Sequence, residues 1–223
     1  MARWPNGPII PDVNSPKEFM DKETARIEAF SDGVFAVAIT LLVLEIKVPP
    51  IGGADLATTL ARQWTSYFAF VISFAFIGIM WMNHHRLFNH IRRSDDTLLV
   101  LNLLLLLGVC VVPFSNAVLA TYLGQRDQRF AALVYNGTYL VIAVLFNVLW
   151  RYAAWNHRLL GHDADKAGVD KLTKQYALGP AMYLVCFVLA FVSVRASLGL
   201  NVLLAAFFAL PPRIAAKVTR THA

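Results

Sequence analysis

Charged residues are scarce in this 223-residue chain: 15% of positions are charged, whereas 57% are hydrophobic. Soluble domains are charged at about a quarter of their positions, so the composition excludes an ordinary soluble fold and predicts a membrane protein. The formal net charge is +6. The basic residues fall in the gaps between apolar runs, where membrane proteins carry their topology signals. We therefore expect membrane lipid, and no nucleic acid, as a partner.

Cysteine is also rare. Cys110 and Cys186 both lie inside apolar runs, which excludes a disulfide framework. The chain has no nucleophile elbow, phosphate-binding loop, dinucleotide fingerprint or HExxH pattern, so we predict no enzyme and no cofactor. His84, His85 and His90 are interleaved with arginines at spacings that suit a metal poorly, and we predict no metal site.

Long uncharged runs are abundant. A helix needs about 20 apolar residues to cross the hydrocarbon core. Four runs meet that length, at 65–83, 97–122, 130–150 and 176–194. The run 197–210 is shorter and stops at two prolines, and a sixth candidate covers 26–47. The sequence thus predicts an all-α membrane protein with six transmembrane helices.

Basic residues are unequally distributed between the two sides of the membrane that these six spans would cross. Fifteen of the 20 Lys and Arg fall in the N-terminal segment, the second and fourth gaps and the C-terminal segment. The other side keeps only Lys47, Arg62, Arg126, Arg129 and Arg195. The positive-inside rule then predicts that both termini are cytoplasmic. We divide the chain into a cytoplasmic lead-in (1–23), a six-helix domain (24–216) and a cytoplasmic tail (217–223).

Local signals refine these elements. Ser15-Pro16-Lys17-Glu18 is typical of a capping box with proline at the first helical position, so helix should begin before the membrane. Asp95 and Asp96 precede the third span and are expected to be cap or interfacial residues. We expect the asparagines inside spans to make hydrogen bonds between helices; these are Asn102, Asn116, Asn136 and Asn147.

The first helix has an unusual pattern. Only twelve uncharged residues separate Asp32 from Glu45, so this helix is better suited to a bundle interior or a wet cavity than to lipid. At 3.6 residues per turn, one stripe carries no charge, while Glu28 and Asp32 point to the other side. The members of the stripe are Phe30, Gly33, Val37, Leu41 and Leu44, with Thr40 on its shoulder.

Two interpretations of the stripe compete. Aliphatic stripes at helical spacing usually pack in a core, with Asp32 then forming an ordinary buried pair. Alternatively, the stripe surrounds a symmetry axis, where rings of Val37, Leu41 and Leu44 form a hydrophobic gate. Thr40 would then offer a ring of hydroxyls to a passing ion. Hydrophobic constrictions can gate by dewetting.

The segment from Arg26 to Leu44 contains an RxxxFSD pattern, made by Arg26, Phe30, Ser31 and Asp32. The pattern resembles the signature of the transmembrane protein 175 family, which comprises endolysosomal cation channels and their prokaryotic relatives. A second segment in the next span also fits the family; it contains Trp81, His84 and His85. The single set of six predicted spans resembles the prokaryotic members, which assemble as tetramers.

The resemblance implies a homotetrameric, potassium-permeable channel in a prokaryotic plasma membrane, with the first helix of each subunit lining a central pore. Val37 then matches the family's aliphatic constriction, Thr40 the threonine linked to selectivity, and Leu44 a further apolar layer. Val37 is smaller than the isoleucine or leucine expected there, which leaves Leu41 and Leu44 as alternative positions for the narrowest ring.

The resemblance also implies a network that joins Arg26, Asp32 and a histidine, with either His84 or His85 bonding Asp32 or Ser31. The permeant species would be monovalent cations. No TVGYG-type filter is present, so the preference for potassium should be modest.

Two other functions remain open from sequence. A secondary transporter would use Asp32 as a proton- or ion-coupling carboxylate, although the paired broken helices and internal repeats of many transporters are not evident. A non-conducting membrane scaffold would tolerate any residue of similar size at Thr40 and Leu44.

Overall fold

The computed structural model describes residues 16–51, 55–161 and 166–209, without the side chains of 16–23, 65, 68, 69 and 206–209. The regular secondary structure of this part of the chain is helical, and its only strand-like pairing is one bridge between Ile91 and Leu160. The elements are α1 (Pro16–Leu41), η1 (Leu42–Glu45), α2 (Leu56–Arg62), α3 (Trp64–Phe88), α4 (Asp96–Tyr122), α5 (Gln128–Ala154), η2 (Trp155–His157), α6 (Lys166–Val192) and α7 (Val194–Ala209).

Each of the six predicted spans overlaps one of the longer helices. Among the described residues, four helical stretches are long and apolar enough to cross a membrane, and α7 contains a shorter apolar helix. The count of six spans stays a prediction. One boundary was wrong: the run 176–194 is divided at Ser193, where α6 ends and α7 begins. The short helix α2 was not predicted.

Helix α1 begins at Pro16, as the proline signal predicts, and continues without interruption past residue 23. The predicted start of the six-helix domain at residue 24 therefore lies within a helix. Residues 1–15 of the predicted lead-in and all of the predicted tail, 217–223, lie outside the described residues.

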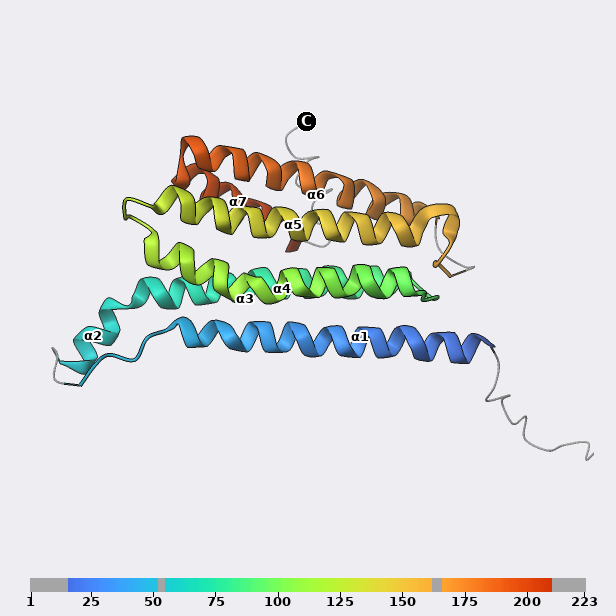
Figure 1. Cartoon of the computed structure of the whole chain (residues 1–223), viewed down its shortest axis with the longest axis horizontal. Coiled ribbons are helices and arrows are strands. Elements are labelled where there is room, and N and C mark those ends of the chain that lie inside the picture. The colour runs from blue at the N-terminus through green and yellow to red at the C-terminus, as the bar shows by residue number, and fades with distance from the viewer. Residues whose placement is uncertain (1–15, 52–54, 162–165, 210–223) are drawn as a thin grey trace, which may run out of the picture.

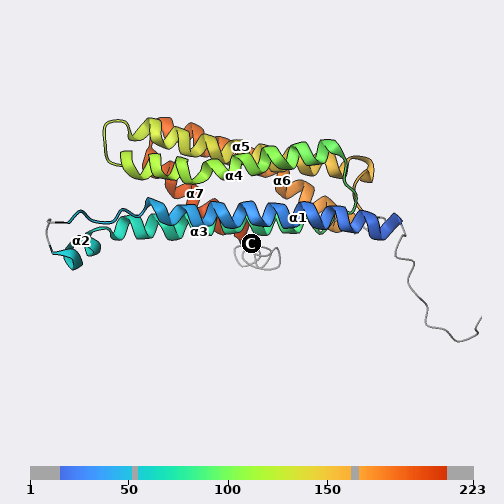
Figure 2. The same cartoon turned by 60° about the horizontal axis from the view of Figure 1, so that its bottom comes forward.

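The helices lie roughly side by side (Figure 1). Helix α1 forms one edge of the bundle and packs on α3 and α4, while α5, α6 and α7 pack together on the other side of α4 (Figures 1 and 2). One long face of α1 is therefore not covered by the rest of the described chain.

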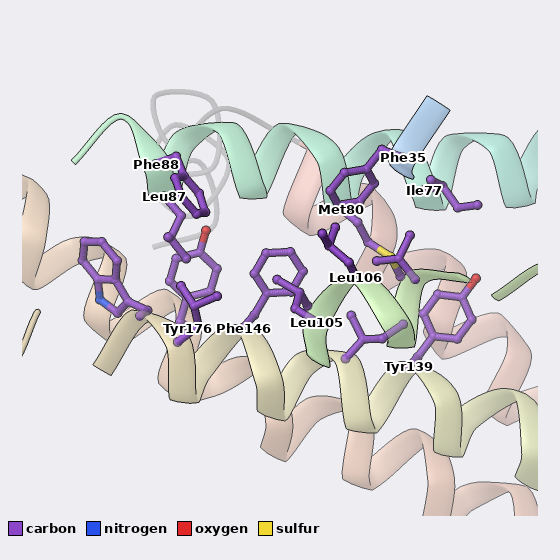
Figure 3. Close-up of a cluster of buried hydrophobic side chains, with 14 of the residues drawn as sticks. Phe35, Ile77, Met80, Leu87, Phe88, Leu105, Leu106, Tyr139, Phe146 and Tyr176 are labelled. Carbon is purple, nitrogen blue, oxygen red and sulfur yellow. The ribbon is translucent and has the colours of Figure 1, made fainter. Parts of the chain in front are cut away.

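A single hydrophobic core joins these helices (Figure 3). It includes Phe35 from α1, Met80 from α3, Leu105 from α4 and Phe146 from α5, and all four are buried. The ring of Phe146 stacks on that of Tyr176 from α6, with the centroids 6.1 Å apart. In lipid, such close packing and hydrogen bonds between helices replace the hydrophobic effect as the main source of association.

Asp95 fastens the start of α4 to the end of α5. Its Oδ1 accepts a hydrogen bond from the backbone N–H of Leu98 at 2.9 Å, which makes it the N-cap of α4. Its Oδ2 accepts one from the Tyr152 hydroxyl at 2.7 Å and lies 3.3 Å from the Arg158 guanidinium. The prediction that Asp95 is a cap residue is confirmed.

Asp95 also links stability to pH. Partial burial opposes its ionisation, but the hydrogen bonds from Tyr152 and Leu98 and the charge of Arg158 outweigh that effect and hold the pKa of Asp95 below its ordinary value. A carboxyl group with a lowered pKa stabilises the fold above its unfolded-state pKa of about 4. This contribution is lost as pH falls below 4 through the folded-state pKa.

We expect Asp95→Ala to lower the free energy of unfolding by about 1 to 2 kcal/mol at neutral pH, because it removes an N-cap and a charge-assisted bond. Thermal unfolding in detergent at pH 7 and pH 3 would measure this, and the difference from wild type should shrink at pH 3. Asp96→Ala is the control, since Asp96 is an exposed carboxylate in the same helical turn. Equal losses in both variants would contradict the assignment.

Candidate functional site

The candidate site is α1 and its contacts with α3 and α4. One face of α1 is buried, and its members recur every three or four residues: Ser31, Phe35 and Ala38, followed by Leu42 at the start of η1. This periodicity matches one side of a helix with 3.6 residues per turn. The buried face meets α3 and α4, which fixes the rotation of α1 about its own axis.

The predicted stripe lies on the opposite, uncovered face. The exposed fraction is 58% for Val37, 42% for Leu41 and 66% for Leu44, and Phe30 is also exposed. A side chain at Gly33 would meet open space. The interpretation that the stripe packs in the core of the subunit is therefore wrong, because the core contacts the buried face of α1 that carries Ser31, Phe35 and Ala38.

The end of α1 differs from the expected regular helix. The α-helix ends at Leu41, and Leu42–Glu45 form the 3-10 helix η1. Leu44 therefore lies in a more tightly wound helix than the rest of the stripe. Thr40 is exposed, and its hydroxyl donates to the carbonyl of Val37 at 2.8 Å. Its oxygen can still accept a hydrogen bond or approach a cation from the uncovered side.

A buried polar chain ties α1 to α4 and α3. The Ser31 hydroxyl donates to the carbonyl of Ile27 at 2.8 Å and accepts from Nδ2 of Asn102 at 3.0 Å. Oδ1 of Asn102 in turn accepts from Nε2 of His84 at 2.9 Å. Ser31, Asn102 and His84 are all buried, so their hydrogen bonds have no competition from solvent. We call this chain of three residues the polar relay.

A second pair of contacts joins α1 to α3 at the margin of the helix interface. The indole N–H of Trp81 donates to Oδ1 of Asp32 at 2.8 Å. Nδ1 of His85 pairs with Oε1 of Glu28, and the His85 ring stacks on that of Trp81. The carboxylates that sequence assigned to the side away from the stripe are thus held by residues of α3.

The observed contacts differ from the expected network of Arg26, Asp32 and a histidine. Neither histidine bonds Ser31 or Asp32 directly: His84 reaches Ser31 through Asn102, and His85 pairs with Glu28. Sequence placed Asn102 among the interhelical hydrogen bonders, which is confirmed, but could not name its partners.

Arg26 and Phe30 of the motif lie outside the polar relay. Both are exposed, and within the described part of the chain Arg26 forms no ion pair. They line a cavity of about 540 Å³ together with Asn102, Asp95 and Asp96. The motif therefore divides into buried residues that fix α1 and exposed residues that are available to a neighbour.

Two of the other asparagines also behave as predicted. Nδ2 of Asn147 donates to the carbonyl of Tyr176, which links α5 to α6. Oδ1 of Asn136 accepts from Nδ2 of Asn201, which links α5 to α7. Asn116 is the exception, because neither end of its buried amide has a partner in the described chain.

Asn102→Leu should lower the free energy of unfolding by about 1 to 3 kcal/mol, because it leaves the buried Nε2 donor of His84 without an acceptor and removes the donor to the Ser31 hydroxyl oxygen. Ser31→Ala should cost less. The double variant should lose less than the sum of the two single losses, because both break the same chain. Thermal or denaturant unfolding in detergent would measure the cycle, with exposed Leu103→Ala as the control. Additive losses would show that the relay is not a unit.

Comparisons with known proteins show which proteins this chain is similar to. A family model described as "Endosomal/lysosomal potassium channel TMEM175" matches residues 26–113, which contain most of α1, all of α3 and most of α4. A potassium channel of Chamaesiphon minutus is 51% identical over 201 residues, which cover 89% of this chain and 98% of the relative. A potassium channel of Streptomyces collinus is 43% identical, covering 83% of this chain and 91% of the relative.

A solved structure has the same fold. The crystal structure of a lysosomal potassium-selective channel TMEM175 homolog from Chamaesiphon minutus superposes with a TM-score of 0.75 at 50% identity, covering 84% of this chain and 97% of that one. Likeness of this extent spans nearly the whole of both proteins. The chain is therefore an integral membrane protein that belongs to the TMEM175 family.

Proposed function

We propose that this chain is one subunit of a potassium-permeable cation channel, and not an enzyme, with the first helix of each subunit lining a shared pore. The observation that carries the proposal is the uncovered aliphatic face of α1, with Val37, Leu41 and Leu44 exposed along it. Two relatives that match nearly the full length of the chain are named as potassium channels, which supports the same assignment.

Charge argues that this face meets a pore and not lipid. The exposed residues of the same helix include Arg26 at one end and Glu45 at the other. A charge exposed to the hydrocarbon is costly, whereas water in a pore solvates it. Thr40 adds a hydroxyl to the exposed face, between two of the aliphatic residues.

One copy of α1 cannot enclose a pore, so the proposal requires an assembly. Four copies around an axis, with the membrane as their surroundings, would present rings of Val37, Leu41 and Leu44 to the centre. At a rise of 1.5 Å per residue, the outermost of these rings lie about 10 Å apart. Such a short apolar constriction can close by dewetting and conduct when it widens.

The polar relay and the Asp32–Trp81 bond then have a positioning function. They set the rotation of α1 on α3 and α4, and this rotation determines which residues face the axis. If α1 were rotated by 100° about its own axis, the aliphatic residues would turn away from the pore axis. The residues one position further along the helix would face it instead. The buried half of the motif would thus keep the pore apolar, and its exposed half, Arg26 and Phe30, would meet the neighbouring subunit.

Potassium flux from proteoliposomes tests the pore. Leu44→Ala should raise the flux several-fold, because it shortens a side chain at the constriction, and Thr40→Ala should reduce the preference for potassium over sodium. Leu107→Ala is the matched control: Leu107 is an α4 leucine that is 61% exposed, close to the 66% of Leu44. This control should conduct like wild type.

Other results of the flux experiment would support a function other than a channel. Saturable, proton-coupled flux that is lost in Asp32→Asn would indicate a transporter. No flux in any folded and inserted variant would indicate a scaffold, and the aliphatic face would then be a packing surface between subunits.

The assembly has its own test. Native mass spectrometry from mild detergent and from nanodiscs should give a particle of four 24.8 kDa chains. A monomer in both environments would rule out the shared pore, since each chain contributes a single helix with this pattern.

A further inference from the structure

Three arginines converge on one cavity at the end of the bundle where α5 and α7 begin. Arg126 and Arg129 come from the connection between α4 and α5 and its continuation into α5, and Arg195 comes from the first turn of α7. The cavity has a volume of about 640 Å³. Figure 1 shows the start of α5, the end of α6 and the start of α7 at the same end of the molecule.

The charges of the three arginines at this cavity are not neutralised by ion pairs within the described residues. All three arginines are exposed, and within the described residues none of them forms an ion pair. Asp127 is the only acidic residue that lines the cavity. The first turns of α5 and α7 carry no acidic residue either.

The position of these arginines is unusual for the chain. The charge pattern assigns only five Lys and Arg to the side opposite the termini, and three of the five meet in this cavity. Membrane proteins keep such residues rare on that side. Their convergence from separate segments therefore points to an anionic ligand that they share.

The rest of the lining combines two polar residues, Gln128 and Ser193, with several apolar ones. Phe130 is 70% exposed and Val192 is 80% exposed, and both line the cavity, with Leu133 half-buried beside them. Cations next to exposed apolar side chains, at the end of membrane-spanning helices, match a molecule with a charged head and a hydrocarbon tail. A soluble anion would gain nothing from contact with the exposed apolar side chains of Phe130 and Val192.

The residues that line the cavity come from α5, α6, α7 and the connection before α5. Helix α1 packs on α3 and α4 instead, and Figure 1 shows α5 and α6 on the far side of α4 from α1. An assembly around α1 would leave this side facing outward. The site does not depend on the proposed channel function, because it uses none of the residues of the α1 face.

We propose that this cavity binds the headgroup of an anionic phospholipid, with Arg126, Arg129 and Arg195 around the phosphate and the acyl chains lying over Phe130 and Val192. The arginine guanidinium suits this task because its donors fit phosphate oxygens in pairs. Bound there, the lipid joins the α4–α5 connection to the α6–α7 junction. It therefore stabilises the bundle at the end opposite to the polar relay.

Thermal unfolding of the purified protein in detergent, titrated with dioctanoyl phosphatidylglycerol, tests the proposal. We expect a saturable rise in the unfolding temperature, and a rise at least threefold smaller with dioctanoyl phosphatidylcholine. Arg126→Gln/Arg129→Gln/Arg195→Gln should weaken the apparent affinity for phosphatidylglycerol at least tenfold, because each basic residue near an anionic lipid contributes about fivefold.

The matched control removes three other exposed arginines: Arg62→Gln/Arg92→Gln/Arg151→Gln. It should bind phosphatidylglycerol like wild type. If the first triple variant does not fold, Arg126→Gln alone in the α4–α5 connection takes its place, with an expected loss of about fivefold.

Three results would overturn the proposal. Equal responses to the two lipids would show that only the acyl chains bind. Equal losses in the two triple variants would show a general effect of charge. A response to inorganic phosphate that saturates and blocks the lipid would make this a site for soluble anions.

Discussion

The absence of water from a membrane interior is the constraint on which this structure depends. Any polar side chain between the helices must find its partner within the protein, and the polar relay from Ser31 through Asn102 to His84 meets this requirement at one place. Its bonds are directional, whereas aliphatic contacts are not. The relay therefore sets the rotation of α1, and the rotation decides which residues remain uncovered.

Much of the fold could be predicted from the sequence, because apolar runs of the required length have few alternatives in lipid. Pro16 marked the start of α1, and Asp95 was correctly predicted as a cap. The division between the last two apolar runs was predicted at 195–196 instead of at Ser193, because a single polar residue between two apolar stretches does not interrupt their hydropathy. The helix α2 was missed because its seven residues, LATTLAR, are too few to show a helical period.

The candidate site was predictable in its residues but not in its contacts. Periodicity identified the stripe that includes Val37 and Leu41, and the motif identified Ser31 and Asp32. Whether a stripe faces a core or an opening depends on which neighbours cover the helix, and one sequence does not contain that information. The same limit applies to Asn102, whose partners lie 71 and 18 residues away along the chain.

The distribution of polar contacts along α1 has a mechanical consequence. Glu28, Ser31 and Asp32 each bond a side chain of another helix, and beyond Asp32 no side-chain bond from α1 to another helix is formed within the described residues. From Phe35 onward α1 is held by apolar contacts, which can slide without losing a directional bond. The helix can thus tilt about the motif, where its polar contacts hold it in place. Leu44 stands about 20 Å from Ser31, so a tilt of about 5° would displace it by about 2 Å.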